Sequence, residues 1–257
     1  MGIKEKLHDL KAAIPPGVKL VAVSKFHPVE RLMEAYDAGQ RLFGENRPQE
    51  LAAKVPLMPA DVQWHFIGHL QTNKLKLVLP HVSMVESVDS LHLLEAIDAW
   101  GAANGRVIPV LLELHLGAEE TKHGFSEDEV LEILNCRQGI VSRRLSRPWL
   151  MNGRGPSSLG RDEDLWSEGD GIQYPAAKNL EFRGLMGMAT NTDDMAVVEA
   201  DFARIEALFH RIREEFPELR ESFTELSIGM SGDWPLAVRH GATIVRIGTD
   251  IFGEREY

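Results

Sequence analysis

The stretch Leu20–Pro28, which reads LVAVSKFHP, decides between the two folds that the sequence permits. Its first five residues form a small apolar run, Lys25 follows directly, and Pro28 ends it. This pattern predicts a buried strand with a lysine at its C-terminal end. An open doubly wound sheet usually has a glycine-rich turn between its first strand and first helix. This turn contains no glycine, so we favour a closed parallel barrel.

The rest of the chain repeats the alternation of strand and helix about eight times. The predicted strands are 19–24, 41–44, 64–67, 84–88, 107–114, 182–188, 225–229 and 243–247. Helical spacing marks 3–13, 29–38, 90–103 and 194–215, and a capping box at 126–129 starts a further helix. The pattern predicts the α/β class and a single (β/α)8 TIM-type barrel with an extra N-terminal helix.

One segment, at about 137–173, has no period. It is rich in Gly, Ser, Arg and Pro, with basic residues in its first half and acidic residues in its second. It lies between the fifth helix and the sixth strand, and such loops are on the barrel face opposite the active site. We expect residues 1–257 to form one barrel domain with a mobile insertion here; the alternative is an arm that binds a partner.

Composition excludes several classes of function. The 257 residues carry a formal net charge of −11, which opposes binding to nucleic acid. The single cysteine, Cys136, excludes an internal disulfide and a multi-cysteine metal site. No apolar run approaches the ~20 residues that a membrane span needs. We therefore expect a cytoplasmic protein that binds neither membrane nor nucleic acid.

The loops after the seventh and eighth strands have the composition of a phosphate cradle. Glycines allow the backbone to approach an anion, and Ser231 and Thr249 add hydroxyl groups. Residues 231–233 also begin a short helix, whose N–H groups favour an anion. Barrels often bind phosphate with these two loops, although a simple turn and helix cap is the alternative.

Lys25 would lie in the same mouth of the barrel. A lysine walled by apolar neighbours has its charged form disfavoured, so its amine can attack a carbonyl carbon. With a phosphate nearby, the carbonyl compound is pyridoxal phosphate or a sugar phosphate. The alternative is a lysine that extends to solvent at a strand end.

The third and fifth strands place other polar residues near the mouth. His65 lies within the third strand and His69 follows it, but no further ligand appears at metal-binding spacing, so we expect no metal site. His65 between two aromatic residues is also consistent with a core histidine. Glu119 and Lys122 follow the fifth strand and are equally consistent with an exposed loop pair.

Six stretches across nearly the whole chain together resemble the pyridoxal phosphate homeostasis protein family, which is similar to the N-terminal domain of alanine racemase. They are LVAVSKFHP, AYDAGQRLFGENRPQE, WHFIGHLQTNK, EETKHGF, RGLMGMA and LSIGMSGDWPLAVRHGATIVRIGTDIFGERE. The resemblance implies a barrel that holds pyridoxal 5'-phosphate as an aldimine on Lys25.

The resemblance also assigns roles around that lysine. Asn46 would lie beside the cofactor, the loops after the last two strands would hold its phosphate, and Arg246 would face the pyridine nitrogen. The cofactor-binding residues that we expect are Lys25, Asn46, His65, Ser227, Met230, Ser231, Arg246, Gly248 and Thr249. We expect no catalytic residues.

The implied function is intracellular pyridoxal phosphate homeostasis, with cofactor-free pyridoxal phosphate enzymes as partners and a monomeric chain. The alternative is an amino-acid racemase-like enzyme, which needs a second acid–base group opposite the lysine. The three tyrosines, Tyr36, Tyr174 and Tyr257, are poorly placed for that role. A sugar-phosphate aldolase using Lys25 is a third reading.

Overall fold

A computed structural model of the chain describes residues 1–117, 123–137 and 177–253. The chain divides into two compact units, Met1–Val130 with Lys178–Tyr257, and Leu131–Ala177. The first unit is the barrel. Of the second unit, residues 131–137 and 177 are described, so positions 138–173 of the predicted insertion lie outside the described residues.

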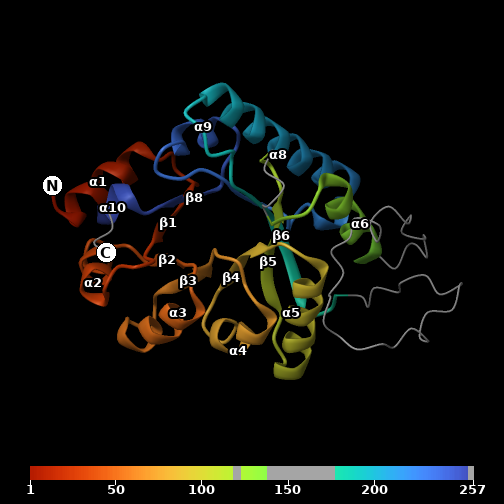
Figure 1. The fold of residues 1–257 in the computed structure, drawn as a ribbon, viewed down its shortest axis with the longest axis horizontal. Coiled ribbons are helices and arrows are strands. Elements are labelled where there is room, and N and C mark those ends of the chain that lie inside the picture. Colours follow the sequence, from red (N-terminus) through yellow and green to blue (C-terminus); the bar gives the residue numbers. More distant parts are fainter. Residues whose placement is uncertain (118–122, 138–176, 254–257) are drawn as a thin grey trace, which may run out of the picture. The chain divides into compact units, whose positions relative to one another are not determined.

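The barrel is closed by eight parallel strands in chain order (Figure 1), which confirms the predicted fold. The strands are β1 (Lys19–Val23), β2 (Leu42–Glu45), β3 (Gln63–Phe66), β4 (Met84–Val88), β5 (Ile108–Leu114), β6 (Leu180–Gly187), β7 (Glu225–Ser227) and β8 (Ile244–Ile247). Pairing between β1 and β8 closes the ring, with Val21 opposite Arg246. The first and last strands therefore lie side by side, and their C-terminal loops are neighbours.

Helices follow the strands on the outside of the barrel, and α1 precedes β1 as expected. They are α1 (Ile3–Ala13), α2 (Val29–Asp37), α3 (Pro48–Lys54), α4 (Leu75–Val78), α5 (Leu91–Asn104), α8 (Met195–Glu215), α9 (Trp234–Arg239) and α10 (Thr249–Phe252). A further helix, α6 (Glu127–Arg137), begins in the first unit and continues into the second. Short 3-10 turns lie at η1 (Val55–Leu57), η2 (Thr72–Lys74) and η3 (Pro217–Leu219).

Helix starts follow the local sequence signals. The predicted capping box before α6 is present: Ser126 N–H donates to Glu129 Oε2 at 2.7 Å, and Glu129 N–H donates to Ser126 Oγ at 3.3 Å. Asp194 caps α8 by accepting from Ala196 N–H at 3.0 Å. These caps orient α6 and α8 at their N-terminal ends.

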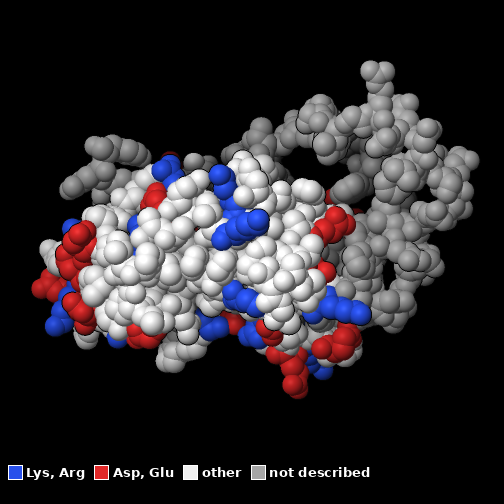
Figure 2. Space-filling model, turned by 90° about the horizontal axis from the view of Figure 1, so that it is seen from below, with Lys and Arg blue, Asp and Glu red and all other residues white. Residues whose placement is uncertain are grey.

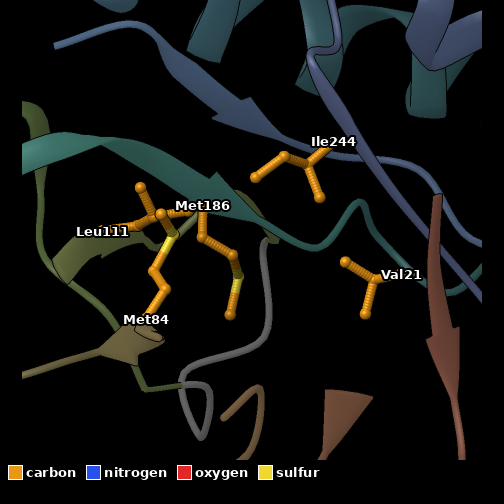
Figure 3. Close-up of a cluster of buried hydrophobic side chains, with 5 residues drawn as sticks. All are labelled: Val21, Met84, Leu111, Met186 and Ile244. Atoms are coloured by element: carbon orange, nitrogen blue, oxygen red, sulfur yellow. The ribbon is translucent and has the colours of Figure 1, made fainter. Parts of the chain in front are cut away.

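An apolar layer fills the middle of the barrel (Figure 3). It consists of buried side chains from five strands: Val21, Met84, Leu111, Met186 and Ile244. Alternate residues of a strand point to the same face, so Glu86, Glu113 and Arg246, each two positions further on, also point inward. A polar layer therefore lies directly above the apolar one, toward the C-terminal ends of the strands.

The outer surface carries both signs of charge. In Figure 2, basic side chains on the face seen from below are scattered and interrupted by acidic ones. Among the helices of the described residues, none combines the length and apolar character that crossing a membrane requires.

Candidate functional site

A cavity of about 910 Å³ opens at the C-terminal ends of the strands, where barrel proteins place their sites. Every strand or its following loop contributes to the wall. One lining residue from each, in chain order, is Val23, Asn46, Ile67, Asp89, Glu113, Met188, Met230 and Arg246. This volume lies within the range of pockets that bind small molecules.

Lys25 lines this cavity from the turn after β1, half-buried, which is where the sequence placed it. The next residue, Phe26, has a φ of 66°, which is unfavourable for a side chain of this size. Glu50 holds the turn, because its Oε2 accepts the Phe26 N–H at 2.9 Å. The Arg47 guanidinium lies 4.2 Å from the centre of the Phe26 ring. The lysine is thus presented by a strained turn that α3 stabilises.

A buried ion pair lies beneath the turn. Lys54, only 7% exposed, places its Nζ 2.6 Å from Glu45 Oε1 and 3.0 Å from Glu50 Oε2. The same Nζ donates to the Ser24 main-chain oxygen at 2.9 Å, and the Ser24 hydroxyl donates to Glu45 Oε1 at 2.8 Å. Burial raises the pKa of Glu45, while Lys54 and Ser24 act in the opposite direction. This network connects β1, β2 and α3 next to Lys25.

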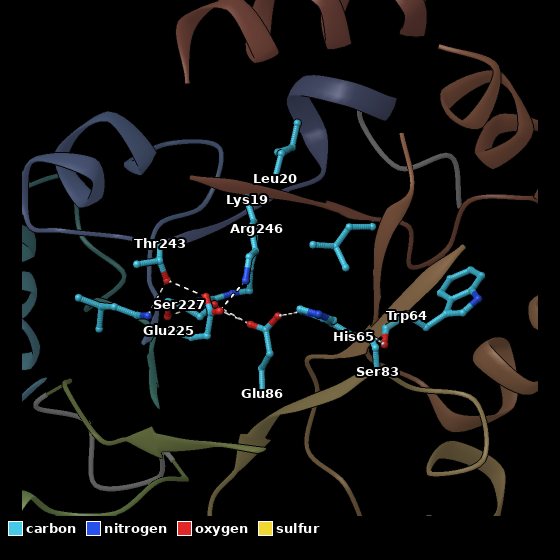
Figure 4. Close-up of polar contacts among 12 residues, drawn as sticks. Lys19, Leu20, Trp64, His65, Ser83, Glu86, Glu225, Ser227, Thr243 and Arg246 are labelled. Carbon is cyan, nitrogen blue, oxygen red and sulfur yellow. Dashed lines mark hydrogen bonds and ion pairs between the residues drawn. The ribbon is translucent and has the colours of Figure 1, made fainter. Parts of the chain in front are cut away.

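Arg246 is held rigidly in the polar layer (Figure 4). Its Nη1 donates to the Ser227 main-chain oxygen at 2.7 Å and to the Ser227 hydroxyl at 2.6 Å, and its Nη2 donates to the Gly187 oxygen at 2.9 Å. Burial lowers the pKa of Arg246, while the carboxylates of Glu86, Glu113 and Asp233 raise it. Arg246 is therefore a fixed hydrogen-bond donor in the cavity wall.

Glu86 links this arginine to His65. Glu86 Oε1 lies 2.5 Å from His65 Nδ1, and Oε2 accepts from the Ser227 hydroxyl at 2.5 Å and lies 3.9 Å from Arg246 Nη1. Burial opposes the charge of Glu86, but the hydrogen bond and charge of His65, with Arg246 and Ser227, hold its pKa below the usual value. A buried chain of polar contacts thus crosses the barrel from β3 to β8.

The structure brings seven of the nine expected residues to the cavity wall. These are Lys25, Asn46, Met230, Ser231, Arg246, Gly248 and Thr249. His65 and Ser227 do not line the cavity; they are buried behind it, in contact with Glu86 and Arg246. Any direct contact of these two with a ligand remains a prediction. Glu119 and Lys122 lie outside the described residues.

The loops after β7 and β8 carry the residues of the predicted phosphate cradle, which we call the anion cup: Ser231, Gly232, Gly248 and Thr249. All four line the cavity. Among the described residues, none accepts a hydrogen bond from the main-chain N–H of Ser231 or Gly232. A Cβ on Gly232 would meet nothing within 4 Å, so this loop borders open space. These groups can therefore receive a phosphate.

Asn46, directly after β2, lines the same cavity as the anion cup. Its Oδ1 is buried and has no hydrogen-bond partner among the described residues. Gly68 fixes its position, because a Cβ at residue 68 would lie 2.5 Å from the Asn46 main-chain oxygen. A buried amide oxygen without a partner is unfavourable, and rotation of the Asn46 side chain toward the cavity would expose it to a ligand.

Sequence reasoning missed the carboxylates Glu86, Asp89 and Glu113. Each interrupts or ends an apolar strand, in MVESVD or VLLEL, and an acidic residue within such a run is a signal of an inward-facing polar group. Burial, followed by the neighbouring charge of Asp89, raises the pKa of Glu113 to about 7. Glu113 can therefore hold or release a proton near neutral pH.

Comparisons with known proteins agree with this architecture. The sequence pattern of the family described as "Alanine racemase, N-terminal domain" matches residues 2–140. The pyridoxal phosphate homeostasis protein of Schizosaccharomyces pombe is 34% identical over 240 residues, covering 93% of this chain and 84% of that protein. The human protein of the same name is 33% identical, covering 99% and 82%.

Solved structures give the same result. PipY of Synechococcus elongatus PCC7942, solved with pyridoxal phosphate bound, superposes with a TM-score of 0.77 at 34% identity. The match covers 98% of this chain and 100% of PipY. Alanine racemase from Corynebacterium glutamicum shares the fold alone, at 16% identity and a TM-score of 0.64, covering 98% of this chain and 60% of that one. On the sequence matches over most of its length, this chain belongs to the pyridoxal phosphate homeostasis protein family.

Proposed function

We propose that this protein binds pyridoxal 5'-phosphate through Lys25 and takes part in intracellular pyridoxal phosphate homeostasis. The observation that carries the proposal is that Lys25 and the anion cup of Ser231, Gly232, Gly248 and Thr249 line one cavity. A primary amine and a phosphate site in one cavity suit a phosphorylated aldehyde. PipY, which is 34% identical over 98% of this chain, has been solved with pyridoxal phosphate bound.

The residues present fit this cofactor. The Lys25 amine would bond to the aldehyde carbon with loss of one water molecule. The N–H groups of Ser231 and Gly232, which have no acceptor in the part of the chain that the structure describes, would hold the phosphate together with the Thr249 hydroxyl. Asn46 lines the same cavity, and its Oδ1, which has no partner among the described residues, would accept a hydrogen bond from the ligand once the side chain turns toward it. His65 and Ser227 would act through Arg246 and Glu86, to which they are bonded.

Arg246 argues against transamination-type chemistry at this site. Bound pyridoxal phosphate acts as an electron sink when its ring nitrogen is protonated. A guanidinium only donates hydrogen bonds, so Arg246 opposite that nitrogen would leave it unprotonated. The hydrogen bonds of Arg246 to the Ser227 and Gly187 oxygens hold its guanidinium in place.

The racemase-like alternative has little support from the described residues. Tyr36 is the one tyrosine among them, and its hydroxyl donates to Asp61 Oδ1 at 2.8 Å, away from the cavity lining. Incubation of the loaded protein with single-enantiomer amino acids tests it: conserved optical purity excludes racemisation, and loss of optical purity establishes it.

Absorption spectra test the binding proposal. The purified protein, or the protein after addition of pyridoxal phosphate, should show the visible band of the protein-linked cofactor. Lys25→Ala should lose the band and keep the thermal unfolding profile of the fold. Lys76→Ala, at an exposed lysine of α4 outside the cavity, is the matched control and should keep the band. Wild-type protein that stays colourless with added cofactor contradicts the proposal.

The homeostatic role requires that the cofactor can leave. We expect the loaded protein to transfer it to cofactor-free pyridoxal phosphate enzymes, as a monomer in the cytoplasm. A single cysteine is compatible with a reducing compartment. Restored activity of such an enzyme on mixing with loaded wild-type protein, together with loss of the visible band, is the expected result. Retention of the band beside an inactive enzyme contradicts the role.

A further inference from the structure

A cluster of three side chains in the cavity wall has no part in the proposed cofactor site. His69 follows β3, Asp89 follows β4, and His123 follows β5, and all three line the cavity. One potential ligand atom from each lies within 4.8 Å of the other two. Two imidazoles and a carboxylate are a ligand set that zinc sites use with a fourth position open.

The Nδ1 atoms of the two histidines both lie near one carboxylate oxygen of Asp89. Asp89 Oδ2 lies 2.6 Å from His69 Nδ1 and 3.8 Å from His123 Nδ1. The two imidazole rings are stacked, with centroids 4.3 Å apart and planes inclined by 19°. Ligand atoms of a tetrahedral zinc ion are about 3.4 Å apart, given bonds of about 2.0–2.1 Å. The present separations lie on both sides of this value, so small side-chain movements bring three ligands onto one ion.

The main chain fixes each of the three positions. The hydroxyl of Ser87 donates to the Gly68 main-chain oxygen at 2.6 Å, which ties β4 to the loop that carries His69. Phe125, two residues after His123, donates its N–H to the Glu113 oxygen at 2.8 Å, and His115 N–H donates to the Phe125 oxygen at 2.9 Å. His123 thus follows the course of β5 although its side chain is exposed.

The carboxylate of Asp89 is buried, whereas the two histidines beside it are exposed. Its side chain is 3% exposed, whereas the side chains of His69 and His123 are 49% and 63% exposed. A desolvated carboxylate below two accessible imidazoles allows an ion to enter from the cavity. A buried negative charge is stabilised by a cation with which it bonds directly.

We propose, contrary to the expectation of no metal site from the sequence, that His69, Asp89 and His123 form a binding site for a divalent transition-metal ion of the zinc type. Nitrogen ligands favour this class over Mg²⁺ and Ca²⁺, which prefer oxygen ligands. The three protein ligands leave a fourth coordination position, which faces the cavity and takes water or a donor atom of a small molecule. This site is built from residues other than those that would hold the cofactor.

Calorimetric titration with Zn²⁺ tests the site. The full-length wild-type protein should bind one ion per chain at this site, and Mg²⁺ should give no comparable signal. His123→Gln, at an exposed side chain, should weaken Zn²⁺ binding by at least ~10-fold while thermal unfolding stays unchanged. His69→Gln and Asp89→Asn should weaken Zn²⁺ binding to a similar degree. Lys25→Ala should bind Zn²⁺ as the wild type does, so this test is independent of the proposed cofactor.

The matched control is His81→Gln. His81 is exposed, precedes β4 and does not line the cavity, so its replacement should leave Zn²⁺ binding unchanged. Absence of Zn²⁺ binding by the wild type overturns the proposal. So does binding that His123→Gln and His69→Gln leave at full strength, because the ion is then bound elsewhere.

Discussion

The side-chain nitrogen of Lys54 lies 2.9 Å from the main-chain oxygen of Ser24, the residue immediately before Lys25. Two lysines therefore lie on either side of one short turn, one facing the cavity and the other buried beneath the turn. The buried lysine is bonded to Glu45 and Glu50. Its role is structural: it neutralises Glu45 and connects α3 to the end of β1.

Replacement of the buried lysine should therefore be costly. Lys54→Met leaves the carboxylate of Glu45 buried without its cation, and we expect a loss of about 3–5 kcal/mol in the free energy of unfolding. Denaturant titration measures it. The double variant Lys54→Met, Glu45→Gln should recover part of the loss, because no uncompensated charge remains. Lys76→Met, at an exposed position of α4, should show no measurable change, and an equally small effect of Lys54→Met would refute this role.

Glu113 should make the stability of the protein depend on pH. Its pKa is about 7 in the folded chain, against 4.5 as the ordinary value. Between these values the unfolded chain has lost the proton and the folded chain retains it, so stability decreases as pH rises from 4.5 to about 7 and is constant above. A shift of this size corresponds to about 3 kcal/mol.

Glu113→Gln should remove this part of the pH dependence. The variant should gain about 3 kcal/mol relative to the wild type at pH 8 and little at pH 4.5, measured by denaturant titration at each pH. Glu95→Gln, at an exposed position of α5, serves as the control and should change neither value. Parallel curves for Glu113→Gln and the wild type would show that Glu113 ionises normally.

The backbone at Phe26 provides a further test, because its φ of 66° suits glycine better than any residue with a Cβ. Phe26→Gly and Phe26→Ala both remove the ring and its contact with Arg47. The difference between their free energies of unfolding therefore reports the backbone strain at position 26. The glycine variant should be more stable by about 1 kcal/mol. At position 95 within α5, Glu95→Ala should be more stable than Glu95→Gly, because alanine favours a helix and glycine does not. An alanine variant at 26 that equals or exceeds the glycine variant would rule out backbone strain.

Gly68 should tolerate no side chain. A Cβ there would lie 2.5 Å from the Asn46 main-chain oxygen and 2.6 Å from the Asn46 Cβ. Gly68→Ala should reduce the free energy of unfolding by about 1–3 kcal/mol and, by displacing Asn46, weaken pyridoxal phosphate binding in a spectroscopic titration. Gly232→Ala, which meets nothing within 4 Å, should leave stability unchanged. Equal stability of the two variants would mean that Asn46 moves freely.

The fold was predictable because its signals are local and repeated. Each of the eight strands overlaps the segment that its apolar run predicts, and α8 carries its apolar residues at helical spacing. The helices α3, α4 and α10 were not predicted. They have seven, four and four residues, too few turns to show a period.

The sequence could predict which residues line the cavity where this follows from their position at the end of a strand. Lys25, Asn46 and Thr249 each follow a strand, and in a parallel barrel all such positions meet at one end. Which polar groups would become partners could not be deduced. The contact of Lys54 with Ser24 joins residues 30 positions apart, and that of Ser227 with Glu86 joins residues 141 apart. Such pairs depend on strand register and helix orientation, which local patterns do not specify.

The pairing of β1 with β8 has a consequence for how a ligand would affect the whole chain. Lys25 extends from the first strand, and Gly248 and Thr249 extend from the last, so a molecule held by both would bridge the seam where the ring closes. Amide hydrogens along that seam should then exchange with solvent deuterium more slowly when the ligand is present. Ligand binding in the cavity would therefore strengthen the pairing of β1 with β8, and loss of the ligand would weaken it.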